Sequence, residues 1–138
     1  MVEENHDRIA KAVQADLGGH KLRGVFDFVG VYEHAQYALN NIDSWTADIP
    51  VKHAEMLGGS VVRTSPKDLI RIIAPFNYPF DLVFSPLVSA IAAGNCAVLK
   101  PSEIAVNSAA LVEELVLKYL DTSCIEVVLG AIPETTEL

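Results

Sequence analysis

Cysteine and positive charge are both scarce in this chain. Two cysteines among 138 residues cannot build a disulfide framework, which favours a reducing compartment. Lysine and arginine number 10, against 18 aspartate and glutamate residues, and the net charge is -8. A surface of this sign repels phosphate backbones and anionic membranes. We therefore expect neither nucleic acid nor membrane as a partner.

Long apolar runs, a leader and metal-ligand spacings are missing as well. The longest apolar stretch, 82–93, is interrupted by Ser85, Pro86 and Ser89 and is too short to span a membrane. The start of the chain is mostly polar, unlike a signal peptide, so we expect a cytoplasmic protein. No HxxxH or CxxC pair occurs, and we expect no metal site among the histidines, which are His6, His20, His34 and His53.

Hydrophobic side chains, by contrast, are abundant. They make up 51% of the chain, and the mean hydropathy is +0.30, both high values for a domain of this size. A well-packed α/β core would account for them, and so would a domain that covers part of its surface with a partner. Composition leaves both interpretations open.

The pattern of the first 59 residues favours helices. A helix is expected at 1–17, where Ile9, Val13 and Leu17 recur every fourth residue. The stretch 46–59 has no clear period, so we expect a connection there. Between them a longer helix is expected at 22–45, with an apolar stripe made of Leu22, Val25, Val29, Tyr32, Leu39 and Ile42.

From residue 60 onward the pattern changes to short strands separated by helices. The strand at 69–73 is almost continuously apolar, as expected of a strand buried on both faces. The other strands are expected at 60–64, 97–99 and 125–129, and the helices at 79–93 and 107–120, with Asn107 and Ser108 capping the second. We therefore expect an α/β chain: two N-terminal helices, then a half Rossmann-type β-α-β-α-β parallel sheet. It would be one domain, with a helical part at 1–59 and the sheet at 60–138.

Two polar clusters follow the strands at 69–73 and 97–99. Open α/β sheets bind ligands outside the carboxyl ends of their strands, so Asn77, Lys100 and Glu103 would face one crevice if these strands are neighbours. Lysine can bind a phosphate or a ribose oxygen, glutamate can accept from ribose hydroxyls, and an asparagine amide can donate to a developing oxyanion. Alternatively, Asn77 caps a helix and the other two form a solvated loop pair.

Three motifs carry a family resemblance. Residues 73–80 read IAPFNYPF, residues 86–95 read PLVSAIAAGN, and residues 98–103 read VLKPSE. Together, in this order and at these separations, they resemble the aldehyde dehydrogenase superfamily. The PETTEL sequence at 133–138 and the helices before the motifs are most similar to its class 3, fatty-aldehyde branch. The resemblance covers the first part of the family's NAD-binding domain.

The resemblance implies roles for individual residues. Asn77 matches the amide that helps to hold the oxyanion, and Lys100 and Glu103 match the residues that hold the adenosine ribose of NAD(P). Phe76 stands beside the cofactor, where the family commonly has tryptophan. The strand near residue 60 matches part of the family's oligomerisation arm.

The same resemblance points to what this chain lacks. The family's glycine-rich turn, its glutamate base and its nucleophilic cysteine would all follow Leu138. Cys96 and Cys124 precede strands, so we expect structural cysteines at the edge opposite the crevice. In the usual 3-2-1 strand order their sulfurs would be close. NAD(P) binding is therefore expected to be weak or absent.

Two functions follow from this pattern. The first is a truncated aldehyde dehydrogenase-like protein without dehydrogenase activity, acting by association with itself or with a full-length relative. The alternative is a small non-redox enzyme, an isomerase, cyclase or dehydratase of a carbonyl compound, that uses Asn77, Tyr78, Lys100 and Glu103. In the second case Lys100 or Glu103 would move a proton if burial shifted its pKa toward neutrality.

Overall fold

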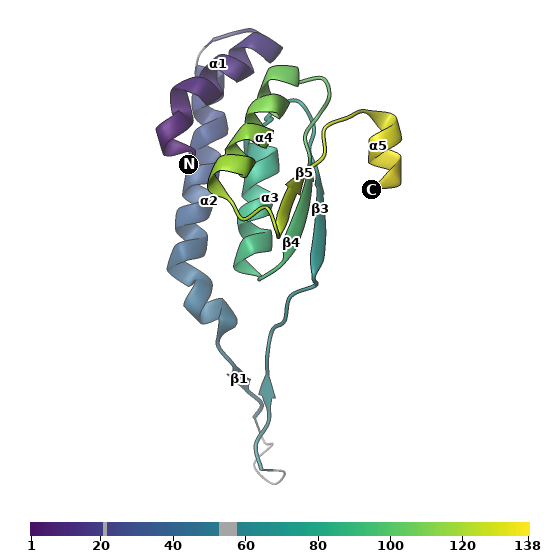
Figure 1. The fold of residues 1–138 in the computed structure, drawn as a ribbon. Helices are drawn as coiled ribbons and strands as arrows, with labels where there is room; N and C mark the ends of the chain where they lie inside the picture. The colour runs from purple at the N-terminus through teal and green to yellow at the C-terminus, as the bar shows by residue number, and fades with distance from the viewer. Residues whose placement is uncertain (21, 53–57) are drawn as a thin grey trace.

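The computed structural model of the chain describes residues 1–20, 22–52 and 58–138, so His53 lies outside it. A 3-10 turn at Glu3–Asn5 leads into the first helix. The elements are α1 (His6–Leu17), α2 (Leu22–Thr46), β1 (Ile49–Pro50), β2 (Val61–Val62), β3 (Leu69–Ile73), α3 (Asp81–Ala92), β4 (Cys96–Lys100), α4 (Val106–Tyr119), β5 (Ile125–Val127) and α5 (Ile132–Glu137) (Figure 1). Of the helices in these ranges, none has both the length and the apolar character needed to cross a bilayer.

The central sheet is parallel and has the order β3-β4-β5. Leu69 pairs with Cys96 and Ile73 with Lys100, so β3 and β4 match along their whole length. β5 pairs with β4 from Ala97 to Leu99. Because α3 and α4 connect successive strands, the predicted β-α-β-α-β arrangement and its 3-2-1 order are confirmed.

A hairpin arm extends from the body between α2 and β3 (Figure 1). Its strands β1 and β2 are antiparallel, with Ile49 opposite Val62 and Pro50 opposite Val61. β1 lies in the stretch that we expected to be a plain connection, and this expectation was wrong. A two-residue strand that contains proline leaves no periodic signal in the sequence.

All four larger helices cover one face of the sheet. α3 and α4 contact the strands, while α1 and α2 pack on their outer side (Figure 1). The core lies between these layers, and its most deeply buried apolar side chains are Ile9, Val13, Phe80, Val83, Phe84, Leu99, Val112, Leu115 and Val116. β4, which lies in the middle of the sheet, is the most buried of the three strands.

The opposite face of the sheet is open in the described part of the chain. Leu69 and Ile73 on β3 are 56% and 57% exposed, and Ile72 alone on this strand is buried. Our expectation that β3 is buried on both faces was therefore wrong for these residues. Of the described helices, α5 alone stands on that side (Figure 1), and it was not predicted.

The apolar stripe expected on α2 is not the buried face of this helix. Leu22, Tyr32 and Leu39 are exposed, whereas the helix buries Gly24, Asp27, Val31 and Ala38. The reason is close packing against α1. A Cβ added to Gly24 would lie 2.5 Å from the Cα of Ala10, so a larger side chain at this contact has no room. Three of the four buried residues of α2 are thus small or polar, and several of its large apolar residues face solvent.

The amino ends of α3 and α4 are capped by side chains from the outer helices. Asp27 of α2 accepts hydrogen bonds from the backbone N–H groups of Phe80, at 3.2 Å, and Asp81, at 2.7 Å. Asp16 accepts from the backbone of Asn107 and Ser108 at 2.9 and 2.7 Å. Asn107 and Ser108, which we expected to be the cap of α4, are instead the residues whose N–H groups are capped.

Candidate functional site at the carboxyl edge of the sheet

The carboxyl ends of β3 and β4 lie side by side. The two strands end at Ile73 and Lys100, which pair with each other, and the Ala74 N–H then donates to the Lys100 carbonyl at 3.0 Å. Consequently the loops that follow both strands leave from the same edge of the sheet. This arrangement agrees with the expectation that the two polar clusters share one edge.

Lys100 and Glu103 form the polar centre of this edge. The Lys100 side chain is 3% exposed, and its Nζ donates to the Pro101 carbonyl at 2.8 Å and to Glu103 Oε2 at 3.3 Å. A turn closed by the Ala105 N–H on the Ser102 carbonyl, at 3.2 Å, brings Glu103 back toward the lysine. A solvated loop pair would leave the ammonium in water, so that interpretation is wrong for Lys100.

Glu103 is ionised at neutral pH in this arrangement. A hydrogen bond from its own backbone N–H, and then the ammonium of Lys100, lower the pKa of its carboxyl group. A lowered pKa moves the group away from neutrality, so Glu103 is suited to accept hydrogen bonds rather than to shuttle protons. The proton-transfer role considered for Glu103 in a non-redox enzyme is therefore not supported.

The loop after β3 presents three side chains to solvent. Phe76 and Tyr78 are 44% and 42% exposed, and Asn77 is exposed as well. Because Asp27 caps α3, the helix-cap interpretation of Asn77 is wrong. Within the described residues the Asn77 side chain forms no hydrogen bond. Three residues further along the chain, Phe80 is fully buried.

The cysteines lie at the other end of the strands. Cys96 begins β4 and Lys100 ends it. Because a strand rises about 3.3 Å per residue, the Cys96 backbone lies roughly 13 Å from that of Lys100 at the crevice. Cys124 directly precedes β5, and its Sγ lies 2.8 Å from that of Cys96. The predicted placement at the opposite edge, with the two sulfurs close together, is confirmed.

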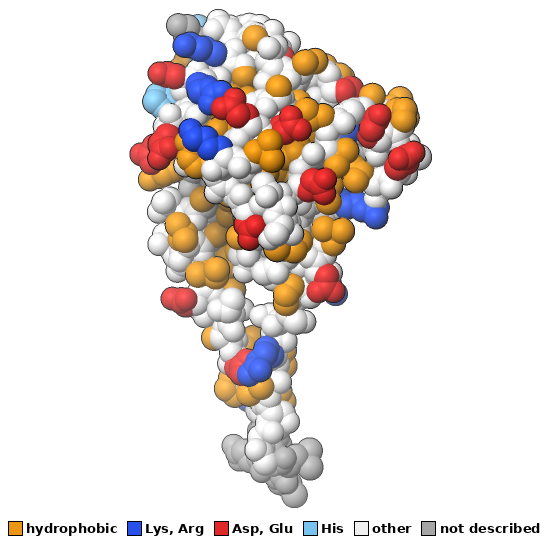
Figure 2. Space-filling view, in the orientation of Figure 1, with side chains coloured by type: hydrophobic (Ala, Val, Ile, Leu, Met, Phe, Trp, Pro, Cys, Tyr) orange, Lys and Arg blue, Asp and Glu red, His pale blue; other side chains and the backbone are white. Residues whose placement is uncertain are grey.

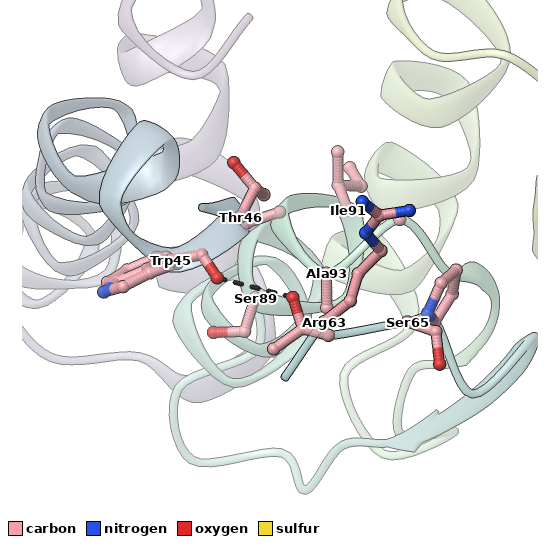
Figure 3. Close-up of a pocket in the computed structure, with 11 residues that line it drawn as sticks. Trp45, Thr46, Arg63, Ser65, Ser89, Ile91 and Ala93 are labelled. Carbon is pink, nitrogen blue, oxygen red and sulfur yellow. Dashed lines mark hydrogen bonds between the residues drawn. The ribbon is translucent and has the colours of Figure 1, made fainter. Parts of the chain in front are cut away.

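A cavity of about 490 Å³ also lies away from the predicted site (Figure 3). It sits where the arm joins the body, between Trp45 at the end of α2 and the carboxyl end of α3 near Ile91. Thr64 donates to the Trp45 carbonyl at 3.4 Å across it. Arg63 on its rim is already paired with Asp48 at 2.6 Å, and none of the predicted site residues lines the cavity.

Comparisons with known proteins agree with the resemblance in the motifs. The model of the aldehyde dehydrogenase family matches residues 1–138. Across its full length the chain is 40% identical to aldehyde dehydrogenase family 3 member B2 of Mus musculus and 39% identical to member B1 of Homo sapiens. The chain belongs to the aldehyde dehydrogenase family. Its similarity to the class 3 branch is thereby confirmed.

The chain spans about 30% of the length of these family members, 29% of the mouse protein and 30% of the human one. Among solved structures, substrate-bound AldH of Staphylococcus aureus matches with a TM-score of 0.90 and 34% identity, over 99% of this chain and 30% of that one. Succinic semialdehyde dehydrogenase of Streptococcus pyogenes, solved with NADP+, matches over the same shares with a TM-score of 0.86 at 20% identity and shares the fold. The aldehyde dehydrogenase chain thus has the α/β fold of the family's nucleotide-binding domain, in its first part.

The sequence pointed to Lys100 and Glu103, which the structure brings into contact, but gave no sign of the aspartates that position the loops at this edge. Asp27 fixes the start of α3, just after Asn77, and Asp16 fixes the start of α4, just after Glu103. Burial alone would raise the pKa of Asp16, but the hydrogen bonds from Asn107 and Ser108 outweigh it and lower that pKa. Each aspartate is distant in sequence from the helix that it caps, so no local pattern reveals it.

Proposed function

We propose that residues 1–138 hold the adenosine ribose of NAD(P) in an aldehyde dehydrogenase, and that they oxidise no aldehyde unaided. The observation that carries this proposal is the buried Lys100 ammonium held beside the ionised Glu103 carboxylate. Together the two groups offer a hydrogen-bond donor and an acceptor at the carboxyl edge of the sheet, where nucleotides bind in open α/β folds.

The residues fit such a nucleotide chemically. An ammonium has three N–H donors, and in the described part of the chain Lys100 has two acceptors, the Pro101 carbonyl and Glu103. The third donor can reach a ribose hydroxyl oxygen, and the exposed side of Glu103 can accept from a ribose hydroxyl. When bound, NAD(P) would supply the hydride acceptor for aldehyde oxidation.

Asn77 has the second role in the proposal. Its amide can donate to an oxygen that becomes negative, and the exposed loop leaves it accessible. The nucleophile has to come from elsewhere, because Cys96 and Cys124 are at the wrong end of the strands. The 138 residues would therefore work by association with the remaining family elements, in a longer relative.

Nucleotide binding tests the ribose site. NMR titration of the chain with NAD and NADP should show weak binding that perturbs Lys100 and Glu103, because these residues contact one end of the dinucleotide. Lys100→Ala and Glu103→Gln should remove the perturbation, whereas Lys67→Ala, in an exposed loop at the opposite edge, should preserve it. Binding that survives both crevice substitutions would mean that the nucleotide sits elsewhere.

An activity assay tests the second half of the proposal. The purified chain should form no NADH or NADPH from aldehydes, and Cys96→Ala and Cys124→Ala should change nothing, because neither thiol reaches the crevice. Steady NADH formation that is abolished by either substitution would contradict it.

A non-redox enzyme at the same edge has less support. The cavity of about 490 Å³ does not include Asn77, Tyr78 or Lys100, and the lowered pKa of Glu103 disfavours proton transfer. Small-molecule sites usually enclose most of their ligand, and this edge is open in the described chain.

A further inference from the structure

The two cysteines meet although 28 residues separate them in sequence. Cys96 is the first residue of β4, and Cys124 immediately precedes β5, the neighbouring parallel strand. Their Sγ atoms are 2.8 Å apart. The sequence contains two cysteines in total, and the fold places them against each other.

The backbone holds both residues in this position. The Cys96 N–H donates to the Asp68 carbonyl at 2.8 Å, and the next residue, Ala97, donates to the Cys124 carbonyl at 2.8 Å. A turn also fixes the other side, because Ser123 donates to Asp121 through its N–H at 2.9 Å and its hydroxyl at 2.7 Å. The proximity of the sulfurs therefore follows from strand pairing and turn geometry.

The pair differs from cysteines that only fill a core. Cys124 is exposed and Cys96 is half-buried, whereas cysteines that serve as small apolar side chains are usually fully buried. The hydrogen bond with Cys124 is the main cause that raises the pKa of Cys96, so this thiol keeps its proton at neutral pH. Reagents in solution meet the exposed Cys124 sulfur first.

We propose that Cys96 and Cys124 form a reversible dithiol–disulfide couple that is oxidised by small-molecule disulfides such as oxidised glutathione. The Cys124 thiolate attacks one sulfur of the reagent, giving a mixed disulfide and releasing one thiol. Cys96 then loses its proton and attacks the Cys124 sulfur, forming the intramolecular bond and releasing the second thiol. The two protein thiols are oxidised, and the reagent disulfide is reduced to two thiols.

Little movement is required for the second step. A disulfide needs a sulfur separation of about 2.05 Å, compared with 2.8 Å here, and neighbouring strands have backbone spacings within the range that disulfides bridge. The bond would tie β4 to β5 and close a loop that contains α4. Such a link restricts the unfolded chain, so oxidation should stabilise the fold without reaching the crevice at Lys100.

Mass spectrometry of the whole chain provides the test. After incubation with oxidised glutathione, the monomer should be lighter by two hydrogen atoms, should resist alkylation at both cysteines, and should return to the dithiol form with a reductant. The oxidised form should melt roughly 5 to 15 °C higher than the reduced form. Cys96→Ser should instead stop at a stable glutathione adduct on Cys124, because the resolving thiol is missing.

Three outcomes would overturn the proposal. They are a wild-type chain that stops at a glutathione adduct, a chain that forms only disulfide-linked dimers, and a chain that stays fully alkylatable. Circular dichroism of the reduced wild type and of both serine variants checks that each is folded, so a negative result can be attributed to the cysteine geometry. Because the readout uses no nucleotide or aldehyde, it is independent of the function proposed for the crevice.

Discussion

Asp27 is the residue with the most unusual environment in this fold. The residue is 1% exposed, one carboxylate oxygen caps α3, and the other oxygen has no hydrogen-bond partner among the described residues. Burial raises the pKa of Asp27 from its ordinary 3.8 to about 6, although the hydrogen bonds from Asp81 and Phe80 oppose that shift. The protonated carboxyl group can accept from the helix and still avoid an unpaired buried charge.

A pH-dependent loss of stability follows. Between pH 4 and 6 the folded state binds more protons at Asp27 than the unfolded state, so the free energy of unfolding should fall as the pH rises through this window. The shift corresponds to at most roughly 3 kcal/mol. Asp27→Asn removes the titrating group. In urea unfolding, the free energy of unfolding of the wild type should therefore fall relative to that of this variant from pH 4 to 6.

Asp43→Asn supplies the matched control, because Asp43 lies on the same helix but is exposed. Its free energy of unfolding should follow that of the wild type across this window. The opposite result would be a wild type whose free energy of unfolding rises relative to that of Asp27→Asn as the pH rises. It would show that the α3 terminus stabilises the charged carboxylate more than burial destabilises it.

The contrast between Lys100 and Asp27 explains what sequence could and could not reveal at the residue scale. Lys100 and Glu103 are three residues apart, so one local motif contains the whole pair. Asp27 and Asp81 are 54 residues apart, and the only local candidate for capping α3 was Asn77. Side chains that act across the chain become visible only when the helices are placed.

At the scale of elements, the central strands were predictable and the helix faces were not. β3 was predicted with its observed bounds, because a run of β-branched residues between turns has few other interpretations. On α2 a stripe of large apolar residues suggested the buried face, but the helix buries Gly24 instead. Close helix packing selects the residue that is small enough, and hydrophobicity does not measure that.

Substitution of glycines on α2 tests this explanation. Gly24→Ala should lower the free energy of unfolding by roughly 1–2 kcal/mol, because the new Cβ would lie 2.5 Å from the Ala10 Cα and the helices must separate. This loss is a net value, because the steric cost should exceed the gain of about 1 kcal/mol in helix propensity.

Gly30→Ala is the matched comparison on the same helix. Its Cβ would meet the Asp81 carboxylate at 2.6 Å, and this side chain can rotate away at the cost of its hydrogen bond from Ser85. The gain in helix propensity should offset that cost, so the change should be close to neutral in urea unfolding. Equal losses for the two variants would indicate that backbone flexibility rather than the contact with α1 explains the glycines.

At the scale of the whole molecule, apolar surface remains on several sides. Figure 2 shows hydrophobic side chains lying between the acidic groups of the body. β3 is an edge strand with one open face, where Leu69 and Ile73 are more than half exposed, and α2 exposes Phe26 at 65%. An open edge and an uncovered face together favour pairing with another sheet.

We therefore expect the chain to self-associate through β3. Sedimentation at tens of micromolar should show dimers or larger species, and Ile73→Lys should shift them toward monomer, because it places a charge on the open face beside the edge. Leu117→Lys is the control, since Leu117 is 65% exposed on α4, on the covered side of the sheet.

The comparison of these variants decides which surface associates. If Leu117→Lys or a Phe26→Lys variant dissociates the species and Ile73→Lys does not, the helical side is the interface, and the open sheet needs another explanation. If the wild type sediments as a monomer throughout, its acidic surface outweighs the apolar contacts. Raising the salt concentration would then screen the net charge of -8. Association should be restored under these conditions if the edge strand β3 is the surface through which the chain associates.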